Sequence, residues 1–335
     1  MAIHRCSILA VCYEDQEKVK YGYGYEYAKG IFKWLQDRGN GFEFNPVVIK
    51  RFRNGERRPQ AELNLRKRNC YVVFNPNDNP SDWMVDILLA NQAVAKSQPQ
   101  EIIDVFTYMN FLRQDRKDKP RVSISARALA RVVQLDANRV LTMDAHNTAI
   151  DGMYDITLDN LSPYKNLARY IHTQESERDV LGILENTIGF SPDKGGGERV
   201  EQCAEVLGFR ETIVGDKRRK TAGEVDRLRI AEKVEGRNIF VIDDILDSGG
   251  TGQTSRESLV GLGAKKIFLY ATHGLFTKGM AYATKGFDRV YIADTVQIPQ
   301  NEPKPDNLRI VPYIDLFGEA IHRTAEGKSL SELFN

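Results

Sequence analysis

The sequence predicts an α/β protein of two domains, each built on a doubly wound, mainly parallel sheet. Short apolar segments typical of buried strands alternate with helical segments in both halves of the chain. Acidic residues follow several of these strands, where open α/β sheets bind ligands. A length of 335 residues suits two domains, which we expect to cover residues 1–163 and 164–335. We expect the last helix to pack on the first domain.

Charge and composition narrow the classes of partner. The chain has 47 Lys and Arg against 46 Asp and Glu, and this net charge of +1 favours neither nucleic acid nor membrane binding. Its four cysteines lack the spacing of zinc sites or paired disulfides, so we expect reduced thiols. No apolar run is long enough to cross a bilayer, and polar residues between Tyr13 and Lys20 argue against a signal peptide. We therefore expect a soluble cytoplasmic protein.

The first domain begins with an apolar run, Cys6–Tyr13, that indicates a strand. A helical pattern follows through Tyr27, Ile31, Trp34 and Leu35 and ends at Gly39–Gly41. Before it, the run YGYGYEY at Tyr21–Tyr27 favours a surface loop over a surface for base stacking. Further elements are expected as strands after Val47 and at Tyr71–Phe74, Ile102–Tyr108 and Arg139–Met143, and as helices at Trp83–Lys96 and Ser123–Gln134.

The segment RFRNGERRPQAEL, residues 51–63, carries an aromatic ring, an amide and a carboxylate at alternate positions. If it is extended, Phe52, Asn54 and Glu56 lie on one face. Such a trio suits an adenine, with the ring stacking and the polar groups bonding the edge of the base. Taken alone, the segment is better explained as an amphipathic edge strand with a turn at Gly55.

Two polar segments follow later strands of this domain. The loop RQDRKDKPR, residues 113–121, offers Arg113, Arg116 and Lys117 to neutralise a triphosphate, although basic clusters are usually only solvated. Past the strand that ends at Met143, Asp144 and His146 lie on one side of the chain if it stays extended. This pair suits either a metal site or a structural role.

The second domain is expected to begin near Leu161–Tyr164, where Ser-Pro-Tyr breaks the pattern. Its strands are predicted at Thr187–Phe190, Glu211–Val214, Ile239–Ile242, Lys266–Ala271, Arg289–Ile292 and Leu308–Pro312. Its helices are predicted from Ala168 to Leu184, from the glycine loop after Asp247 to Leu262, and from Ile314 to Ala325.

Two segments of this domain suit phosphate chemistry. In SPDKGGGER, residues 191–199, Asp193 and three glycines offer a carboxylate and exposed amides at a helix N-terminus, or simply form a Gly-rich turn. The segment DKRRKTAGEVDR, residues 216–227, is either a disordered surface loop or a lid. As a lid, its cations would neutralise the transition state of a phosphoryl transfer.

The stretch IFVIDDILDSGGTGQT, residues 239–254, is the most informative part of the chain. Asp243 and Asp244 follow an apolar strand, and a loop of small residues then leads into a helix. The loop amides suit a phosphate, whereas the carboxylates suit magnesium, sugar hydroxyls or both. The stretch therefore predicts a phosphorylated sugar as ligand. No Lys follows the glycines, so it is not a Walker loop.

This stretch resembles the phosphoribosyl-pyrophosphate loop of type I phosphoribosyltransferases and their relatives. The chain also carries, in order, FRNGE, NDN, RQDRKDKPR, MDAH, SPDKGG, DKRRK, VIDDILDSGGT and ATHGLF. From about Lys50 to Phe334 it resembles the ribose-phosphate diphosphokinases, also called phosphoribosyl pyrophosphate synthetases. The resemblance implies two type I phosphoribosyltransferase-like domains, with ATP-binding segments in the first and the ribose-phosphate loop in the second.

The resemblance implies a role for each matching residue. The residues that read adenine across a subunit boundary are Phe52, Asn54 and Glu56, and those that contact the rest of ATP are Arg113, Gln114, Asp118 and His146. The residues of the metal site are Asp144, His146 and Asp193, of which Asp193 lies near the anomeric end of the sugar. The ribose-phosphate site consists of Asp243 and Asp244, which engage the hydroxyls and magnesium, and of the 5-phosphate cradle Asp247, Ser248, Gly249, Gly250 and Thr251. The catalytic cations are Lys217 and Arg219.

The implied reaction is attack by the ribose C1 hydroxyl on the β-phosphorus of Mg-ATP, which forms phosphoribosyl pyrophosphate and AMP. Mg²⁺ is the implied cofactor and ATP the co-substrate. Family members assemble from dimers, commonly into hexamers, so we expect a homo-oligomer.

Three alternatives stay open. Some divergent phage-borne relatives use ADP-ribose as acceptor, which requires the loop at Ser248–Gln253 to leave an exit for the nucleotide. A phosphoribosyltransferase would share the DDILDSGGT loop but would need no half with RQD and MDAH. A non-catalytic regulatory homologue would lose the lid cations, whereas Lys217 and Arg219 are present.

The chain departs from the family pattern in four places. The region before Lys50 is longer and more aromatic, and NPSDW lengthens the segment after NDN. Asn110-Phe111 stands where the family has Pro-Tyr, and ADTVQIP from Ala293 differs from the usual Thr-Asn/Asp-Thr/Ser-Ile-Pro. Because the catalytic positions are filled, we expect activity to be retained. Regulation, assembly and choice of acceptor do not follow from the resemblance.

Overall fold

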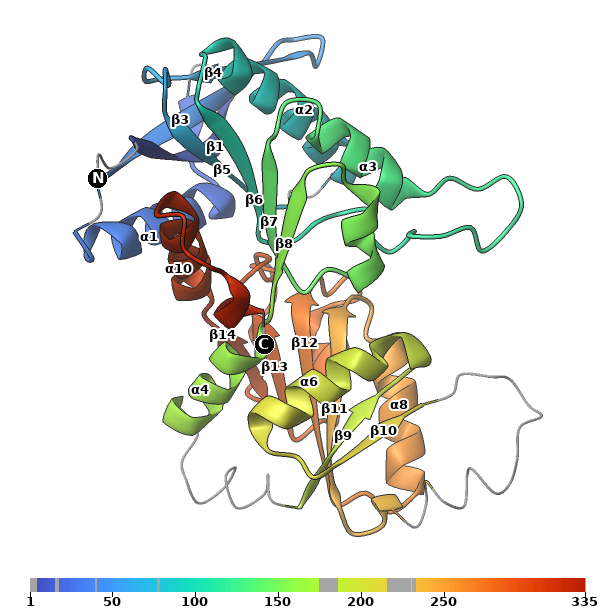
Figure 1. Ribbon diagram of the computed structural model, residues 1–335. Helices are drawn as coiled ribbons and strands as arrows, with labels where there is room; N and C mark the ends of the chain where they lie inside the picture. The colour runs from blue at the N-terminus through green and yellow to red at the C-terminus, as the bar shows by residue number, and fades with distance from the viewer. Residues whose placement is uncertain are drawn as a thin grey trace. The chain divides into compact units, whose positions relative to one another are not determined.

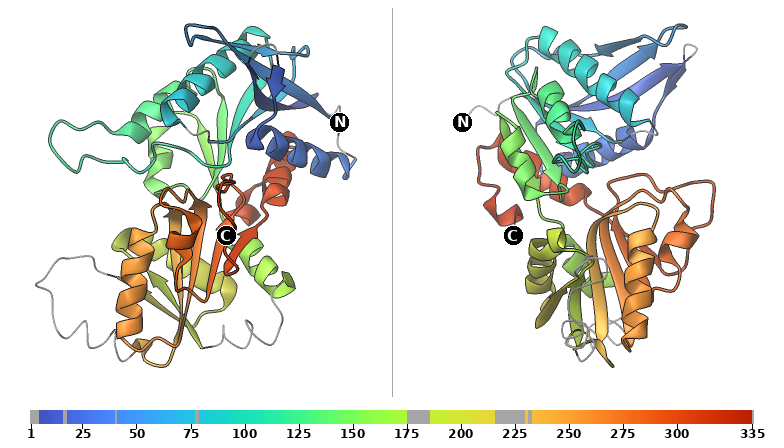
Figure 2. Two further views of the ribbon diagram at one scale, coloured as in Figure 1. Left: turned by 180° about the vertical axis from the view of Figure 1, so that it is seen from behind. Right: turned by 90° about the vertical axis from the view of Figure 1, so that its right-hand side faces the viewer.

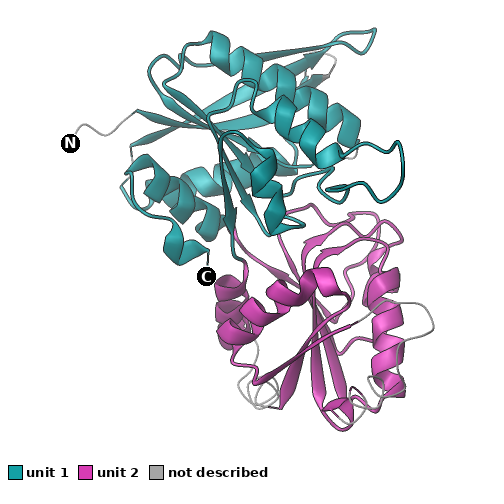
Figure 3. Ribbon diagram, turned by 45° about the vertical axis from the view of Figure 1, so that its right-hand side comes forward, with its two compact units in different colours: residues 1–162, 314–334 teal, residues 163–313, 335 magenta. Residues whose placement is uncertain are grey.

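The fold is given by a computed structural model that describes residues 5–15, 18–39, 41–76, 79–174, 186–215, 230 and 233–334. The chain divides into two compact units (Figure 3): unit 1 comprises Met1–Ser162 and Ile314–Phe334, and unit 2 comprises Pro163–Tyr313. Each unit has a mostly parallel sheet covered by helices, which confirms the predicted α/β class. Within the described ranges, no helix is long and apolar enough to cross a membrane.

Unit 1 is built on an eight-stranded sheet in the order β4-β3-β1-β5-β6-β7-β8, with β2 paired to β1. Two pairs are antiparallel, β1 with β2 and β3 with β4, and the other neighbours are parallel. The strands are β1 (Cys6–Asp15), β2 (Lys18–Lys20), β3 (Phe42–Arg51), β4 (Arg57–Ala61), β5 (Asn69–Phe74), β6 (Glu101–Phe106), β7 (Arg139–Met143) and β8 (Thr157–Leu161).

Helices cover both faces of this sheet (Figures 1 and 2). They are α1 (Tyr23–Gln36), α2 (Pro80–Lys96), α3 (Ser125–Val133) and α10 (Ile314–Ala325), with the 3₁₀ turns η1 (Thr148–Met153) and η3 (Ser331–Leu333). Helices α1 and α10 pack together, with the rings of Tyr27 and Phe317 6.1 Å apart. Gly318 of α10 lies against Trp34, where a Cβ atom would come within 2.5 Å of the indole. The end of the chain therefore belongs to the core of unit 1.

Helix α1 begins earlier than predicted, because Tyr23 is already helical. The expectation of a surface loop for the YGYGYEY run is therefore wrong from Tyr23 onward. Tyr23 and Tyr27 are one helical turn apart, with ring centroids 6.1 Å from each other, and Tyr27 is buried. Gly24 permits a close approach, since a Cβ atom there would lie 2.8 Å from Asn75 Cβ.

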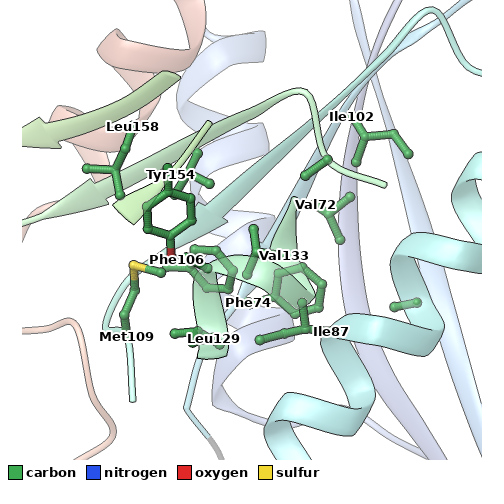
Figure 4. Close-up of a cluster of buried hydrophobic side chains, with 14 of the residues drawn as sticks. Val72, Phe74, Ile87, Ile102, Phe106, Met109, Leu129, Val133, Tyr154 and Leu158 are labelled. Atoms are coloured by element: carbon green, nitrogen blue, oxygen red, sulfur yellow. The ribbon is translucent and has the colours of Figure 1, made fainter. Parts of the chain in front are cut away.

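One face of the unit 1 sheet carries a core of buried apolar side chains (Figure 4). Phe74 and Phe106 of neighbouring strands stack at 5.4 Å, and Trp83 of α2 meets Phe106 edge-on at 5.5 Å. Removing such side chains from water is the main stabilising contribution to the unit. The core holds β5, β6 and α2 in place and so fixes where their loops begin.

Unit 2 is built on a six-stranded sheet, all of whose neighbouring strands are parallel, in the order β10-β9-β11-β12-β13-β14. The strands are β9 (Thr187–Ser191), β10 (Glu211–Val214), β11 (Asn238–Leu246), β12 (Lys266–Gly274), β13 (Arg289–Ala293) and β14 (Leu308–Val311). The helical elements are α4 (Tyr164–Gln174), η2 (Lys194–Gly196), α6 (Gly197–Leu207), α8 (Gly250–Gly261) and α9 (Met280–Thr284).

The central strand β11 is buried on both faces. Val241 lies in an apolar cluster with Leu259 of α8, whereas Phe240 on the other face stacks at 6.1 Å from Phe268 and at 6.0 Å from Tyr291. A strand segment that is covered on both faces is apolar at every position, which explains the uninterrupted apolar run Ile239–Ile242. This strand therefore presents its carboxyl end at a fixed place in the unit.

Candidate active site

The segment Phe52–Glu56 forms the loop of the β3–β4 hairpin and not an extended strand. The Phe52 N–H donates to Glu56 O at 2.8 Å and the Gly55 N–H to Phe52 O at 2.9 Å, with Gly55 at φ +89°. Asn54 Oδ1 accepts from the Glu56 N–H at 3.2 Å. Phe52 is 43 % exposed, and the Arg58 guanidinium lies 5.9 Å from its ring centroid. The loop thus presents an aromatic face to solvent.

The predicted triphosphate loop follows β6 and leads to α3 (Figure 1). Its shape is held by Gln114, whose Nε2 donates to Arg116 O at 2.7 Å and to Asp118 Oδ1 at 3.3 Å. Three of the predicted ATP-binding residues, Arg113, Gln114 and Asp118, therefore belong to one internally bonded loop.

Asp115 is a residue of this site that the sequence analysis missed. It accepts two hydrogen bonds from the Arg116 guanidinium, at 2.8 and 2.7 Å, and one from Asn147 Nδ2 at 3.0 Å. The hydrogen bond from Arg116 is the main cause that lowers the pKa of Asp115, and the charge of His146 contributes. Asp115 thereby links the triphosphate loop to the segment that carries His146. Asp115 could have been predicted as a site residue, because it directly follows Gln114 in a loop at the end of a strand.

The segment after β7 turns sharply at Asp144, which has φ +46°. The chain does not stay extended through His146, because a left-handed residue redirects it, so the condition under which Asp144 and His146 would lie on one side is not met. The Asp144 N–H donates to Leu161 O at 3.1 Å, and the Ala145 N–H donates to Asn160 Oδ1 at 2.9 Å. Asp144 is buried and His146 half-buried. A non-glycine residue in this conformation costs about 1 kcal/mol or more and recurs at functional sites.

The two predicted ATP segments lie in different parts of the unit 1 sheet. The hairpin loop follows β3, whereas the triphosphate loop follows β6, and β1 and β5 lie between these strands. Three strand spacings amount to about 14 Å. The structure therefore brings Arg113, Gln114, Asp118 and His146 to neighbouring strands but keeps the Phe52 loop apart from them within one chain.

In unit 2, Asp193 closes the turn after β9. Its Oδ1 accepts from the Gly196 N–H at 3.2 Å, and its backbone O accepts from Ser191 Oγ at 2.8 Å. A Cβ atom at Gly196 would collide with Ser191 Oγ, so the turn needs glycine there. One of the backbone amides predicted to be exposed, that of Gly196, is therefore already bonded to Asp193.

Strand β11 runs to Leu246, so Asp243 and Asp244 lie inside it and not past its end as predicted. Asp243 pairs with Ala271 of β12 and is half-buried, whereas Asp244 is buried. Burial, and then the charge of Asp244, raise the pKa of Asp243 to about 8. The Asp243 carboxyl group therefore holds its proton near neutral pH more firmly than a free carboxyl group does.

The predicted phosphate cradle, Asp247–Thr251, joins β11 to α8. Gly249 has φ +80°, and a Cβ atom there would lie 2.7 Å from Ala283 Cα. Asp247 Oδ1 accepts from Thr277 Oγ1 at 2.6 Å, which fixes the start of the loop. The N-cap residue of helix α8, Gly249, has no side chain to cap the helix, and the Gly250 N–H donates to Ser248 Oγ at 3.4 Å. The N-terminus of this helix suits an anion. Gln253 turns away and donates to the carbonyls of Tyr282 and Lys285, at 3.1 and 3.0 Å.

Two further residues of unit 2 belong to this site, and the sequence analysis missed both. Arg199, in the first turn of α6, carries a charge that opposes the rise in the pKa of Asp243. His273 is buried at the end of β12, beside Ile245, and its Nδ1 lies 2.8 Å from Thr295 Oγ1. Since β9, β11 and β12 are adjacent, their carboxyl ends bring Asp193, the Asp243–Asp244 pair and the cradle together.

Comparisons with known proteins identify the family. A family model for the N-terminal domain of ribose phosphate pyrophosphokinase matches residues 25–135, and a model for the phosphoribosyl synthetase-associated domain matches residues 216–335. The ribose-phosphate pyrophosphokinase of Aquifex aeolicus is 34 % identical over 298 residues, which cover 88 % of this chain and 92 % of that protein. The chain belongs to the ribose-phosphate pyrophosphokinase family. The resemblance stated from the motifs is confirmed, and the chain is an enzyme of this type.

Other ribose-phosphate pyrophosphokinases agree with this identification. That of Agrobacterium fabrum is 33 % identical over 292 residues, which cover 86 % of this chain and 92 % of the relative. The crystal structure of phosphoribosylpyrophosphate synthetase from Mycobacterium smegmatis matches 96 % of this chain and 100 % of its own, with a TM-score of 0.79 at 22 % identity. This likeness confirms the phosphoribosyltransferase-like fold of both domains.

The predicted catalytic cations and the predicted metal ligands differ in what the structure describes of them. Lys217 and Arg219 lie outside the described residues, so their catalytic role stays a prediction. Among the described residues, no three His, Cys, Asp or Glu side chains gather as a metal site. Mg²⁺ commonly takes one or two carboxylates and completes its shell with water and substrate phosphates, so Asp144 with His146, or Asp193, fits an ion that arrives with a nucleotide.

Proposed function

We propose that the protein transfers the diphosphoryl group of Mg-ATP to the C1 hydroxyl of ribose 5-phosphate. The C1 oxygen attacks the β-phosphorus, the bond from that phosphorus to the oxygen shared with the α-phosphorus breaks, and AMP leaves. The hydroxyl proton passes to solvent. The products are phosphoribosyl pyrophosphate and AMP.

The carboxyl edge of β11 carries this proposal. An uncapped helix start next to a glycine in the left-handed region suits a terminal phosphate, and it follows directly on two carboxylates that suit the ribose hydroxyls. Both groups belong to one continuous segment, Asp243–Thr251, so a single small ligand would engage both. A phosphorylated pentose has this combination of groups.

The triphosphate loop of unit 1 supports ATP as the donor. Arg113, Gln114 and Asp118 would bind the nucleotide together with His146, and Asp115 keeps the loop and the His146 segment joined. We propose that Asp144 with His146 in unit 1, and Asp193 in unit 2, would hold Mg²⁺, which would neutralise charge on the phosphoryl oxygens. We propose that Lys217 and Arg219 stabilise the charge that develops on the transferred group, because such transfers depend on positioning and electrostatics.

A second copy of the chain is part of the proposal. Phe52, Asn54 and Glu56 lie about three strand spacings from the triphosphate loop of their own chain, so we propose that they serve the adenine of a neighbouring subunit. A dimer is the smallest assembly with complete sites, and a hexamer assembled from such dimers fits the family. We place the enzyme in the cytoplasm, which suits its four buried thiols.

The test is release of AMP from Mg-ATP by the purified protein, measured with no acceptor, with ribose 5-phosphate and with ADP-ribose. We expect AMP only with ribose 5-phosphate, together with phosphoribosyl pyrophosphate in equal amount. AMP formed with ADP-ribose alone would assign the same transfer to a 5-substituted ribose phosphate. No AMP with either acceptor contradicts the enzymatic function and favours a regulatory homologue.

A further inference from the structure

An arginine flanks the hairpin loop Phe52–Glu56 on each side, and both arginines bind the same helix. Arg51 is the last residue of β3 and Arg57 the first of β4. Arg51 Nη2 lies 3.3 Å and Arg57 Nη2 2.6 Å from Asp82 Oδ2, in the first turn of α2. One carboxylate therefore joins the two ends of the loop.

Arg57 is bound more deeply than Arg51. Only 6 % of its side chain is exposed, and its Nη1 donates to Asp86 Oδ1 at 2.6 Å and to the Asp82 backbone O at 2.9 Å. Asp86, with 2 % of its side chain exposed, also accepts from the Tyr13 hydroxyl at 3.0 Å. A guanidinium held by two carboxylates and a carbonyl has little freedom to move. The start of β4 is therefore fixed to α2.

The position of Asp82 follows from the way α2 begins. Asn79 caps the helix, with its Oδ1 accepting from the N–H groups of Ser81 and Asp82 at 3.0 and 3.4 Å. A carboxylate in the first helical turn is favoured by the helix dipole. Asp82 lies within NPSDW, the run that lengthens this segment relative to the family pattern. The insertion thus supplies the carboxylate that binds both arginines.

We propose that Asp82 and Asp86 are positioning residues for the nucleotide, because they hold the loop that presents Phe52, Asn54 and Glu56 to adenine. This inference rests on the proposed function. The loop projects into solvent, with Phe52 43 % exposed, so it needs support at its base. A loop that is ordered before the nucleotide binds loses less conformational entropy on binding. The ion pairs thereby raise affinity and base selectivity without touching the ligand.

The first test replaces Asp82 by Asn and measures steady-state kinetics. We expect KM for ATP to rise about threefold to tenfold, since a partly exposed carboxylate with two arginine partners is lost. We expect kcat and KM for ribose 5-phosphate to stay unchanged and the preference for ATP over GTP to fall. Glu43→Gln is the matched control: Glu43 pairs with Arg68 at 2.9 Å near the start of the same strand β3, away from the loop.

The second test asks whether Asp82 acts through the loop. In a Phe52→Ala background, where the stacking ring is gone and only Asn54 and Glu56 remain, Asp82→Asn should raise KM for ATP by a smaller factor than in the wild type. Such non-additivity is expected of residues that act as one unit. Asp86→Asn would leave Arg57 buried with one partner and destabilise the fold, so Asp86 is tested by Arg57→Lys. This variant keeps the charge but loses the forked contacts, and it should resemble Asp82→Asn.

The outcomes separate this inference from the function on which it rests. A wild-type protein that forms no AMP overturns both. An active wild type, with Asp82→Asn no different from Glu43→Gln in KM for ATP and in nucleotide preference, overturns the inference alone. It is also overturned if Asp82→Asn raises KM for ATP equally with and without Phe52.

Discussion

The Asp243 side chain accepts a hydrogen bond from the backbone N–H of Asp244 at 3.0 Å, so two consecutive acidic residues interact within one buried strand. The pKa of Asp243 is about 8 in the folded protein, against about 3.9 in an unfolded chain. Between these values the folded state holds more protons than the unfolded state. The free energy of unfolding therefore falls as pH rises through this window.

Asp243→Asn should stabilise the protein and inactivate it. Without the carboxyl group, the free energy of unfolding no longer falls as pH rises. We therefore expect it to increase by about 1–2 kcal/mol at pH 8 and by little at pH 5, after discounting for the partial exposure of Asp243. Turnover should fall about 100-fold or more, because a group that engages the ribose is lost. Thermal unfolding at both pH values and AMP release measure the two effects.

The control for Asp243→Asn is Asp306→Asn, which removes an exposed carboxylate of the same unit. This variant should keep the activity and the pH dependence of the wild type. A stability gain of Asp243→Asn that is equal at pH 5 and pH 8 would contradict the raised pKa of Asp243.

Gly249→Ala should damage both the fold and the phosphate cradle. Gly249 has φ +80°, which an alanine adopts only with strain, and the added Cβ atom would lie 2.7 Å from Ala283 Cα. We therefore expect the unfolding free energy to fall by about 1–3 kcal/mol. The shifted loop should raise KM for ribose 5-phosphate more than KM for ATP. Gly261→Ala, where a Cβ atom meets nothing within 4 Å, should be neutral or slightly stabilising. Equal behaviour of the two variants in chemical denaturation would rule out the strained cradle.

Asp115→Asn should weaken ATP binding while leaving the acceptor site intact. The neutral amide loses the charge-assisted bonds from Arg116, so the triphosphate loop is less firmly tied to the Asn147 segment. We expect KM for ATP to rise severalfold, with KM for ribose 5-phosphate unchanged. Asp151→Asn, at an exposed position in η1, serves as the control. If both variants keep the wild-type KM for ATP, Asp115 has no part in the site.

Lys217→Ala should lower kcat strongly and leave KM for ATP and KM for ribose 5-phosphate nearly unchanged, because the charge of Lys217 is proposed to act on the transition state. A loss of about 100-fold in kcat is the expected scale for one electrostatic contact. Lys233→Ala removes an exposed cation and should behave as wild type. Unchanged turnover of Lys217→Ala would remove the lid from the mechanism.

The ends of the strands that carry the site could be predicted from the sequence. Apolar runs and the Gly-rich turns that follow them are formed by residues close together in the chain. The limits of β7 and β10 agree with the prediction, and β11 begins one residue earlier than predicted. Its continuation to Leu246 was missed because Asp243 and Asp244 look like a strand end. Pairing of Asp243 with Ala271 and of Ile245 with His273 extends the strand through them.

Contacts between distant segments could not be predicted from the sequence. Asp115 and Asn147 are 32 positions apart, and only the pairing of β6 with β7 brings their loops together. The turn at Gly55 was predicted, whereas the antiparallel pairing of β3 with β4 around it was not, because the alternation of residue types does not specify a partner strand. The link from Arg57 to Asp86 spans 29 positions and carries no sequence motif.

Unit 1 is discontinuous along the chain: its sheet ends at Leu161, whereas α10 joins it from Ile314 onward. During synthesis, the ribosome therefore makes all of unit 2 before it delivers the helix that covers Tyr27 and Trp34. Until then the side of α1 that contacts α10 is uncovered, although α1 already packs on β1 and β3, and nascent unit 1 is a target for chaperones that bind exposed apolar surface. A stop codon or frameshift late in the gene would consequently damage the nucleotide half of the enzyme, although that half is encoded first.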